Sequence, residues 1–409
     1  MNRQRWKKYG FIAEVIVLTL TAVLCWKDVS EGAFTAGRSM DPAANVPESG
    51  TTREEKSGTN GEEGSAAGSG KDSGTDSAGK DYIKWVDFHV TSEAMRQACA
   101  YDVDTYGQEG HLNWVDLLAY LGAKYGGDFS HYRASDLDEA AARLQNGETM
   151  ETIAADMKYF PYYREAYGAV LDGLLGQYET EIAAEDAPDF ALPTDEAGNP
   201  IRDGEKVWVT KYGLKAFSPI AYGFPYSEYD DFGVSRSYGF RRQHLGHDMM
   251  GQVGSPIIAV ESGRVEALGW NQYGGWRIGI RSFDGKRYYY YAHLRKNYPY
   301  QSSLQEGSVV SAGDVIGYMG RTGYSATENT NNIDESHLHF GIQLIFDESQ
   351  KEGNNEIWID CYELVKFLSL HRSEVYKVEG TKEWTRTYQM RDPAVAEYMG
   401  ELENGNGGG

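Results

Sequence analysis

The sequence predicts a multidomain α plus β protein: an N-terminal transmembrane helix, a small all-α domain and a mainly antiparallel β domain. Three observations support this division. An apolar stretch lies close to the N-terminus, residues 81–180 repeat apolar side chains at helical spacing, and residues 206–370 alternate short apolar runs with glycine turns. A chain of 409 residues has room for two folded domains and further unfolded segments.

Residues 1–36 are predicted to be a cytoplasmic basic tip followed by a signal-anchor. Four basic residues precede an apolar run from Phe11 to Trp26, whose only charge is Glu14. A helix of this length spans about 24 Å, slightly less than a hydrocarbon core of about 30 Å. The basic flank predicts a single-pass membrane protein whose remaining chain is exported. A cleaved signal peptide is the alternative, but no convincing small-x-small site comes directly after Leu24.

Residues 37–80 are rich in Gly, Ser, Thr and charged side chains and have almost no large apolar residue. Such a segment cannot bury enough surface to offset its ordering entropy, so it is predicted to be a disordered linker. Its root-mean-square reach is about 35 to 40 Å on flexible-chain scaling. The linker would let a folded domain search a layer outside the membrane.

Charge and cysteine content exclude two classes of protein. The net charge of −22 argues against a nucleic-acid partner, because phosphates require clustered Lys and Arg. Three cysteines do not form a disulfide framework. Cys25 falls in the predicted membrane segment, and Cys99 and Cys361 are predicted to be thiols in different domains.

Residues 81–180 are predicted to be a helical domain of unknown function. The first clear helix follows a possible N-cap at Asn113, ends at glycines 126–127, and carries its apolar residues at Trp114, Leu117, Leu118, Leu121 and Tyr125. A second helix is predicted from Ser135 to Gly147, and a third from Met150 to Met157, ending at Pro161.

An aromatic run follows in this domain, comprising Tyr159, Phe160, Tyr162, Tyr163 and Tyr167. Burial alone explains a stripe at helical spacing, so core packing is favoured over a sugar or peptide groove. The domain could bind a cell-envelope protein. A muramidase using Glu139 or Glu151 as its acid is a weak alternative, since exposed helix glutamates are usually solvated.

An acidic, proline-containing linker is predicted at 181–205, and a zinc-ligand-bearing β domain at 206–370. Apolar runs at 257–260, 264–268 and 315–319 predict strands, and Asp284-Gly285 between 276–282 and 286–293 predicts a hairpin. Residues 362–368 are predicted to close this domain, and 371–409 to form a C-terminal tail that is mobile from Gly380 onward.

Two histidine clusters carry the predicted chemistry. In the strand-like run from Ser336 to Leu344, alternation sends His337, His339 and Gln343 to one face. His339 with His244 and Asp248 would supply three zinc ligands and leave one position open. For either cluster alone, chance or an ordinary satisfied core histidine is about as good an explanation.

The order of several short motifs resembles the lysostaphin and LytM-type zinc endopeptidases of peptidoglycan, over residues 222–368. These motifs are His244-Leu-Gly-His-Asp248, Gly254-Ser-Pro-Ile-Ile-Ala259, Gly263-Arg-Val265, Tyr291-Ala-His293-Leu294, Gly313-Asp-Val-Ile-Gly317, Thr322-Gly323 and His337-Leu-His339-Phe340. The resemblance implies the duplicated hybrid motif fold. Several motifs in one order are far more specific than any single one.

Carried over residue by residue, the resemblance makes His244, Asp248 and His339 the Zn²⁺ ligands and makes His337 and His293 the catalytic histidines. It implies hydrolysis of a peptide bond in a peptidoglycan stem or cross-bridge by a zinc-activated water, without a covalent intermediate. His337 would accept the proton of this water, and His293 would hold the water or stabilise the oxyanion. The catalytic domain would then lie on the cell-wall side of the membrane.

Several positions depart from the family or have no family role. The loop 325–336 is long and is expected to edge the groove, and Gly341 stands where Glu is common. His247 is interpreted as a surface or supporting residue. Strand alternation predicts that Tyr289, Tyr291 and His293 share a face, with His293 in a groove flanked by aromatic rings.

Two other functions compete with the zinc endopeptidase. A non-catalytic scaffold or activator of the same fold would bind the cell wall or a partner protein, but such relatives usually lack a ligand and this set is complete. A zinc D,D-dipeptidase separates its first His and Asp more widely and adds a later Glu and His, which does not match His-x-x-x-Asp with His-x-His.

Overall fold

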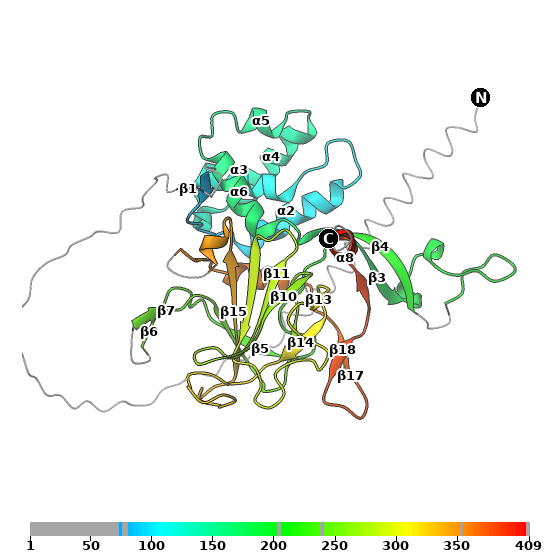
Figure 1. The fold of residues 1–409 in the computed structure, drawn as a ribbon. Coiled ribbons are helices and arrows are strands. Elements are labelled where there is room, and N and C mark those ends of the chain that lie inside the picture. Colours follow the sequence, from blue (N-terminus) through cyan, green and yellow to red (C-terminus); the bar gives the residue numbers. More distant parts are fainter. Residues whose placement is uncertain (1–72, 76–80, 203–205, 238–240, 352–354, 406–409) are drawn as a thin grey trace, which may run out of the picture. The chain divides into compact units, whose positions relative to one another are not determined.

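The computed structural model describes residues 73–75, 81–202, 206–237, 241–351 and 355–405 (Figure 1). The predicted transmembrane segment 11–26 lies outside them, as does most of the predicted linker 37–80. Within that linker, β1 (Ser73–Thr75) is described and pairs antiparallel with β2 (Asp81–Ile83). Across the described ranges, no helix is both long and apolar enough to cross a bilayer.

The helical region contains the predicted first helix at its predicted bounds. At the start of helix α3 (Trp114–Tyr125), the Asn113 side chain accepts hydrogen bonds from the backbone N–H groups of Val115 and Asp116. The helix ends at Gly126, whose φ is 64°. Its neighbours are α2 (Ser92–Thr105) and α4 (Ala134–Gln145), which is the predicted second helix shifted by one residue at its start. A short turn, η1 (Phe129–His131), joins α3 to α4.

The predicted third helix is wrong in length, and Pro161 has the opposite role. Helix α5 (Met150–Ile153) is one turn long, and Pro161 lies in the first turn of α6 (Phe160–Leu171). Proline fits there because the first N–H groups of a helix have no partner within the helix. The aromatic run packs as expected: Tyr167 is fully buried and its ring contacts Tyr163, Phe88 and Phe129.

The main sheet has eight strands, and its neighbouring strands are antiparallel, as predicted (Figure 1). β16 (Ile357–Trp358) pairs with β15 off the main path. Along that path the strands are β13 (Val309–Val310), β10 (Gly263–Asn271), β11 (Gly275–Ser282), β12 (Arg287–Ala292), β15 (His337–Leu344), β8 (His247–Gly251) and β5 (Tyr226–Glu228). The Asp284-Gly285 hairpin is confirmed between β11 and β12.

Two small sheets accompany the main one. β9 (Pro256–Ile258) pairs with β14 (Val315–Tyr318), and β6 (Ser235–Ser237) pairs with β7 (Arg241–Gln243). η4 (Glu348–Gln350) and helix α7 (Tyr362–Leu368), the predicted closing element, follow β15. Their packing leaves one face of the main sheet available for a site.

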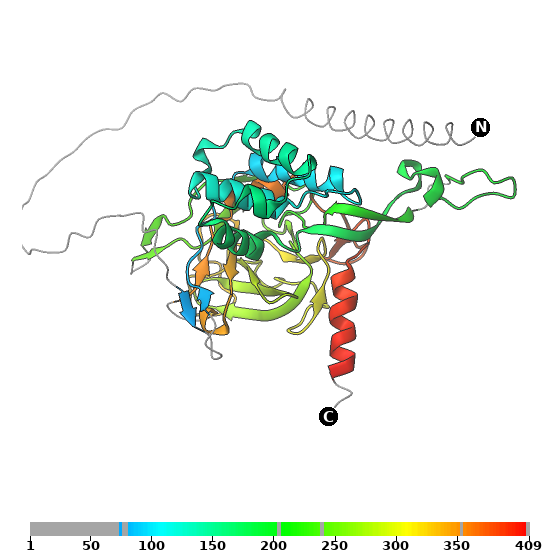
Figure 2. The same ribbon diagram turned by 90° about the horizontal axis from the view of Figure 1, so that it is seen from above.

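One hydrophobic core runs from the helical region into the β domain. It includes buried residues of α3 and α6 together with the inward side chains of β11, β12 and β15. Trp114 of α3 and Phe367 of α7 have ring centroids 5.9 Å apart, and the carboxylate of Glu363 accepts a 2.7 Å hydrogen bond from Ser92 N at the start of α2. The helices therefore cover one end of the sheet and share its core (Figure 2).

The segment predicted as an acidic linker connects two paired strands. β3 (Leu175–Ala183) and β4 (Lys206–Leu214) pair residue for residue over their whole length and form an arm that extends from the body (Figures 1 and 2). Two short turns, η2 (Ala184–Asp186) and η3 (Asp189–Ala191), lie between them. The prolines of the predicted linker lie in the segment that connects β3 to β4.

The predicted mobile tail from Gly380 onward contains paired strands and buried side chains up to Asp392. β17 (Val375–Lys377) pairs with β18 (Trp384–Arg386), β19 (Met390–Arg391) pairs with β3, and α8 (Pro393–Gly405) follows. Met390 and Arg386 are buried, so this segment contributes to the folded body. Its strands are only two or three residues long, which explains why no alternation pattern revealed them.

Candidate metal centre

Strands β15 and β8 place two of the predicted ligands side by side. Alternation along β15 buries Leu338 and Phe340 fully, and His339 lies on the opposite face, as predicted. The antiparallel register sets His339 directly opposite Asp248 of β8. Side chains of opposed residues are close neighbours, so this imidazole and this carboxylate meet.

His244 completes the cluster from the loop before β8. Its Nε2 lies 3.1 Å from Asp248 Oδ1 and 2.9 Å from His339 Nδ1, and the latter two atoms are 2.9 Å apart. Four-coordinate zinc with bonds of about 2.0–2.2 Å sets its donors about 3.3 Å apart. The three donor atoms form a triangle of nearly that size, so this His, Asp and His set fits a zinc ion.

Burial and hydrogen bonding shift the pKa values of His244, Asp248 and His339 in different ways. Burial lowers the pKa of His244, but the hydrogen bonds that its ring donates to the Asp231 and Asp248 carboxylates outweigh burial and raise this pKa to about 9. Burial raises the pKa of Asp248, yet its contacts with His244 and His339 leave it far below the usual range for a carboxyl. Burial also lowers the pKa of His339. Asp248 is therefore an anion and His339 favours its neutral, ligating form.

Two supporting residues were not predicted from the sequence. The Nδ1 of His244 donates toward Asp231, whose carbonyl oxygen is 3.1 Å away and whose Oδ2 is 3.2 Å away. The guanidinium of Arg236 binds Asp248 Oδ2 at 2.7 Å and also contacts the Asp231 carboxylate. Both residues lie on loops or short strands before His244, where no periodic pattern distinguishes them. They orient the ligands and fix which nitrogen of His244 faces the centre.

The two predicted catalytic histidines lie beside the three ligands. The ring centroid of His293 is 4.8 Å from that of His337 and 5.8 Å from that of His339. His337 Nδ1 is 3.0 Å from the Glu335 carbonyl oxygen, and His293 Nδ1 is 2.9 Å from the Thr322 carbonyl oxygen. A carbonyl only accepts, so each Nδ1 carries a proton, and in the neutral form of each ring Nε2 is the nitrogen with the lone pair.

The prediction that Tyr289 and Tyr291 share the face of His293 is wrong. Both tyrosines are buried in the core, and β12 ends at Ala292. His293 has a φ of 63°, so the strand alternation does not extend to it. This left-handed backbone turns its side chain toward the two histidines of β15. Such a conformation in a non-glycine residue is held by its surroundings and is frequent at functional sites.

The Thr322-Gly323 motif holds His293 in place. Thr322 is fully buried; its Oγ1 donates to the Leu294 carbonyl at 2.6 Å and accepts from Trp276 N at 3.1 Å. Gly323 has a φ of 126°, and a Cβ there would lie 3.1 Å from His293 Nδ1. The Thr322-Gly323 motif therefore connects the segments next to His293 and leaves enough space for the His293 ring.

A cavity of about 660 Å³ adjoins the predicted ligands His244 and His339. Its lining combines polar and charged side chains with four aromatic rings, those of Tyr273, Tyr288, Tyr290 and Trp358, in place of the predicted Tyr289 and Tyr291. The ring of Tyr290 is 6.0 Å from His339 and 6.0 Å from Trp358. This shape and lining suit an extended peptide next to the metal centre.

Gly341 and His247 have structural explanations. A Cβ on Gly341 would lie 2.8 Å from the Trp358 ring, so glycine lets this ring pack against the strand and line the cavity. His247 is buried, with its Nε2 2.9 Å from a Glu228 carboxylate oxygen, which makes it a supporting residue and rules out the predicted surface position. Cys361 is a buried free thiol and Cys99 a partly buried one.

The other predicted features of function lie away from this centre. Glu139 and Glu151 of the helical region are exposed, which is the usual state of solvated helix glutamates. The long loop 325–336 packs against the sheet through Asn329, whose Oδ1 accepts from Trp276 Nε1 at 2.9 Å and from Asn297 N at 2.8 Å. It lies near the strand end that carries His293, although it does not line the cavity.

Comparison with known proteins agrees with this geometry. Residues 242–353 match the model of peptidase family M23. The L-Ala–D-Glu endopeptidase of Bacillus subtilis is 37% identical over 130 residues, which are 32% of this chain and 38% of that protein. Lysostaphin of Staphylococcus simulans is 37% identical over 98 residues, which are 24% of this chain and 17% of that protein.

A solved structure of the lysostaphin catalytic domain from Staphylococcus simulans is 30% identical and aligns with 34% of this chain and 92% of that domain, at a TM-score of 0.27. This chain spans only 38% and 17% of the two whole relatives, so the similarity concerns the β domain. The family match covers all five clustered histidine and aspartate side chains. The β domain of this chain therefore contains a peptidase family M23 match over residues 242–353, and its sequence similarity to the two relatives lies in the same domain.

Proposed function

We propose that this chain is a zinc-dependent endopeptidase that hydrolyses peptide bonds in the stem peptides or cross-bridges of peptidoglycan. The observation that carries the proposal is the convergence of His244, Asp248 and His339 within hydrogen-bond distance of one another. Two further imidazoles lie beside them, at His293 and His337. A scaffold protein would have no need for this complete and buried set.

The three ligands would hold a zinc ion through His244 Nε2, Asp248 and His339 Nδ1. A bound zinc supplies a water whose pKa falls toward about 7 and a Lewis acid for the scissile carbonyl. Asp231 and Arg236 would keep the ligands oriented, since each bonds directly to a ligand side chain. The aromatic cavity beside the ligands would orient the peptide and exclude water around it.

His337 is assigned the role of general base. Its Nδ1–H donates to the Glu335 carbonyl, so Nε2 is the nitrogen that can accept a proton. That nitrogen lies 3.7 Å from Asp248 Oδ2, on the side of the predicted ligands. His337 would take the proton of the attacking water and deliver it to the leaving amine.

His293 is assigned the role of holding the attacking water. Burial, together with the neighbouring His337 and His339, holds its pKa well below the usual value, so the ring is neutral. Its Nδ1 proton is committed to the Thr322 carbonyl. The remaining lone pair on Nε2 can accept a hydrogen bond but cannot donate one, which favours water binding over oxyanion stabilisation.

The substrate assignment comes from the relatives and from the shape of the site. One relative is named for the L-Ala–D-Glu bond and another is lysostaphin, and in each case the similarity covers the domain with the clustered histidines. A peptide of the bacterial cell wall is therefore the substrate class to test. The aromatic walls of the cavity do not by themselves select one bond.

Zinc content and wall hydrolysis test this function together. The wild-type protein is expected to bind one zinc ion per chain and to release new amino termini from purified peptidoglycan. His339→Ala is expected to lose both properties, because it removes one of three ligands. His131→Ala, at an 83% exposed side chain away from the site, is the control and should keep both. A metal-free wild type that releases no termini would instead favour the scaffold.

Asp231→Asn is expected to weaken zinc binding by about 10- to 100-fold, the usual effect of losing an outer partner of a ligating histidine. The substitution removes the negative charge next to His244 Nδ1 and keeps the backbone carbonyl that also accepts from it. Competition with a chelator of known affinity measures the change. Asp189→Asn, at a 74% exposed carboxylate, is the control. Equal zinc affinity in wild type and Asp231→Asn would exclude this supporting role.

The proposed location is the outer side of the cell membrane. This rests on the apolar segment 11–26 and its basic flank, which lie outside the described residues. A single-pass anchor and an extended linker would place the catalytic domain at the wall. Membrane fractionation of cells producing the full chain, compared with a chain starting at residue 37, tests the anchor.

A further inference from the structure

We propose that Arg277 selects peptide substrates that carry a carboxylate close to the scissile bond. This inference rests on the proposed function and adds a specificity residue and a substrate charge to it. The sequence did not single out Arg277, and the family motifs do not include it. Its assignment comes from its position in the sheet and from its lack of a carboxylate partner.

Sheet register places Arg277 on the same face as the metal centre. Ala292 of β12 is opposite His339 of β15, and Tyr291 is opposite Ile278 of β11. Arg277 therefore lies two strands from His339, at about 10 Å between backbones. Ile278 and Tyr291 are buried in the core, so Arg277 points to the other side and lines the cavity with His339.

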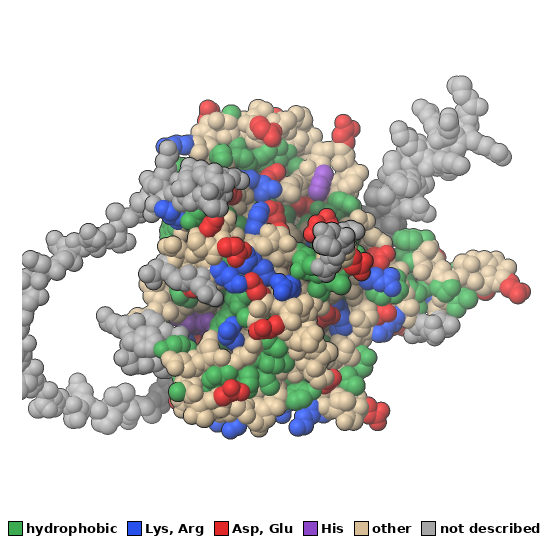
Figure 3. Space-filling view, in the orientation of Figure 1, with side chains coloured by type: hydrophobic (Ala, Val, Ile, Leu, Met, Phe, Trp, Pro, Cys, Tyr) green, Lys and Arg blue, Asp and Glu red, His purple; other side chains and the backbone are tan. Residues whose placement is uncertain are grey.

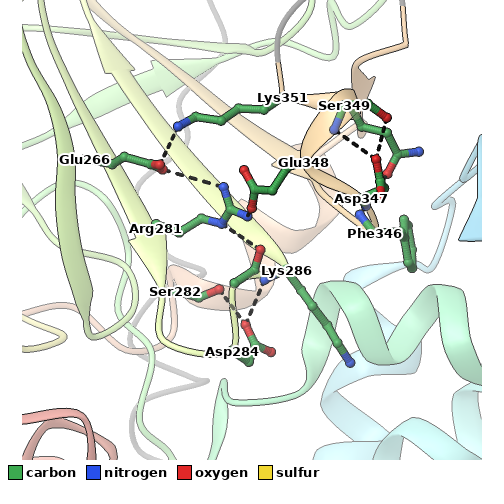
Figure 4. A network of polar contacts seen from close by, with 12 residues as sticks. Glu266, Arg281, Ser282, Asp284, Lys286, Phe346, Asp347, Glu348, Ser349 and Lys351 are labelled. Atoms are coloured by element: carbon green, nitrogen blue, oxygen red, sulfur yellow. Dashed lines mark hydrogen bonds and ion pairs between the residues drawn. The ribbon is translucent and has the colours of Figure 1, made fainter. Parts of the chain in front are cut away.

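Neighbouring cations are neutralised by the protein itself. In Figure 4, Lys351 and Arg281 both point toward the carboxylate of Glu266. Arg281 also binds Glu348, and Lys351, which lines the cavity too, is therefore not an independent anion site. Figure 3 shows the same arrangement more broadly, with basic side chains lying next to acidic ones on the visible face.

Arg277 has no such neutralising partner among the residues that the structure describes. In the described part of the chain, no carboxylate lies within ion-pair distance of its guanidinium, which instead hydrogen-bonds the Tyr288 side chain. Its Nε is buried without any hydrogen-bond partner. The acidic side chain of the cavity wall, Glu356, accepts from Trp358 Nε1 at 2.7 Å. An arginine with spare donors beside a peptide site is suited to a carboxylate ligand.

Distance limits where this carboxylate sits on the substrate. An extended peptide advances about 3.3 to 3.6 Å per residue, so a span of about 10 Å corresponds to about three residues of extended peptide. The carboxylate would thus lie about three residues from the bond that is cut. At this distance its charge is expected to change the cleavage rate, which an assay can measure.

The test compares two matched peptides that contain an L-Ala–D-Glu bond. One peptide carries a free carboxylate beside its backbone. In the other peptide, a carboxamide replaces that carboxylate and nothing else differs. Wild type is expected to show a kcat/KM about 10- to 100-fold higher for the acid, the size expected for a hydrogen-bonded charge. Arg277→Gln is expected to bring this acid-to-amide ratio close to one. Arg264→Gln removes an exposed cation of the same sheet that does not line the cavity, and it should keep the wild-type ratio.

Binding to metal-free protein separates this inference from the proposed function. Fluorescence polarisation with the same two labelled peptides measures selection without catalysis. If neither peptide is cleaved but wild type binds the acid more tightly and Arg277→Gln does not, the proposed function fails and this inference stands. If the peptides are cleaved but Arg277→Gln keeps the acid preference, or wild type has none in either assay, the inference is overturned and the proposed function stands.

Discussion

Replacing His337 with alanine is expected to lower kcat for peptidoglycan hydrolysis by about 10²- to 10⁴-fold, the usual contribution of a general base. The zinc content should stay at the wild-type level. His337 donates its Nδ1–H to the Glu335 carbonyl and contributes no atom to the triangle formed by His244, Asp248 and His339. Loss of its imidazole therefore removes a proton acceptor and keeps the metal ligands.

The separation of catalysis from metal binding is the informative part of this experiment. Metal analysis and hydrolysis are measured on the same preparation, at saturating substrate so that kcat is read directly. His131→Ala serves again as the control for a histidine outside the site. Parallel loss of zinc and activity in His337→Ala would show that His337 is a ligand or supports one. Near wild-type turnover with full zinc would remove it from the mechanism.

The face of His339 could be predicted from the sequence because it depends on local geometry, whereas its meeting with His244 and Asp248 was expected from ligand chemistry and the family resemblance. Strand alternation alone puts His339 opposite to the buried Leu338 and Phe340. The pairing of β15 with β8 then brings Asp248 to His339. The helix α3 was equally predictable, because its cap at Asn113, its apolar period and its glycine stop all indicate the same bounds.

Features that depend on long-range contacts were not predictable in this way. The face of His293 was missed because a φ of 63° ends the alternation at Ala292, and Thr322 and Gly323 are what stabilise that turn. Asp231 and Arg236 act on the ligands from irregular segments with no period. The spare donors of Arg277 become visible only when the partners of the neighbouring cations are known.

The core shared by the helical and β regions also depends on long-range contacts and was not predictable from the sequence. Helical and β segments each showed their own period, which predicted two domains separated by a linker at 181–205. The structure instead buries residues of both regions in one cluster and pairs β3 with β4 across that segment. Arg287 is the polar residue that joins the two regions most directly, since its guanidinium reaches from β12 to the Ala169 carbonyl of α6 at 2.9 Å.

Arg287→Met is expected to destabilise the protein by about 3–5 kcal/mol, because it leaves the buried carboxylate of Glu261 without its cation. The Arg287 side chain is 1% exposed and binds Glu261 through two nitrogens, at 2.8 and 3.0 Å. It also binds Asp284 at 2.9 Å. After the substitution, the Tyr289 hydroxyl, 2.6 Å from Glu261, would be the remaining donor in this group.

Urea unfolding of the folded protein measures the change, and two variants define its cause. Arg391→Met breaks a pair whose side chains are 65% and 47% exposed, so a clearly smaller change is expected there. Arg287→Met combined with Glu261→Gln should recover part of the lost stability, because no buried charge is then left unpaired. If Arg287→Met unfolds with wild-type free energy, or if the double variant is less stable than the single one, then the buried pair does not stabilise the junction. Apolar packing in the shared core, together with contacts such as the Ser92–Glu363 hydrogen bond, would then hold the helices to the sheet.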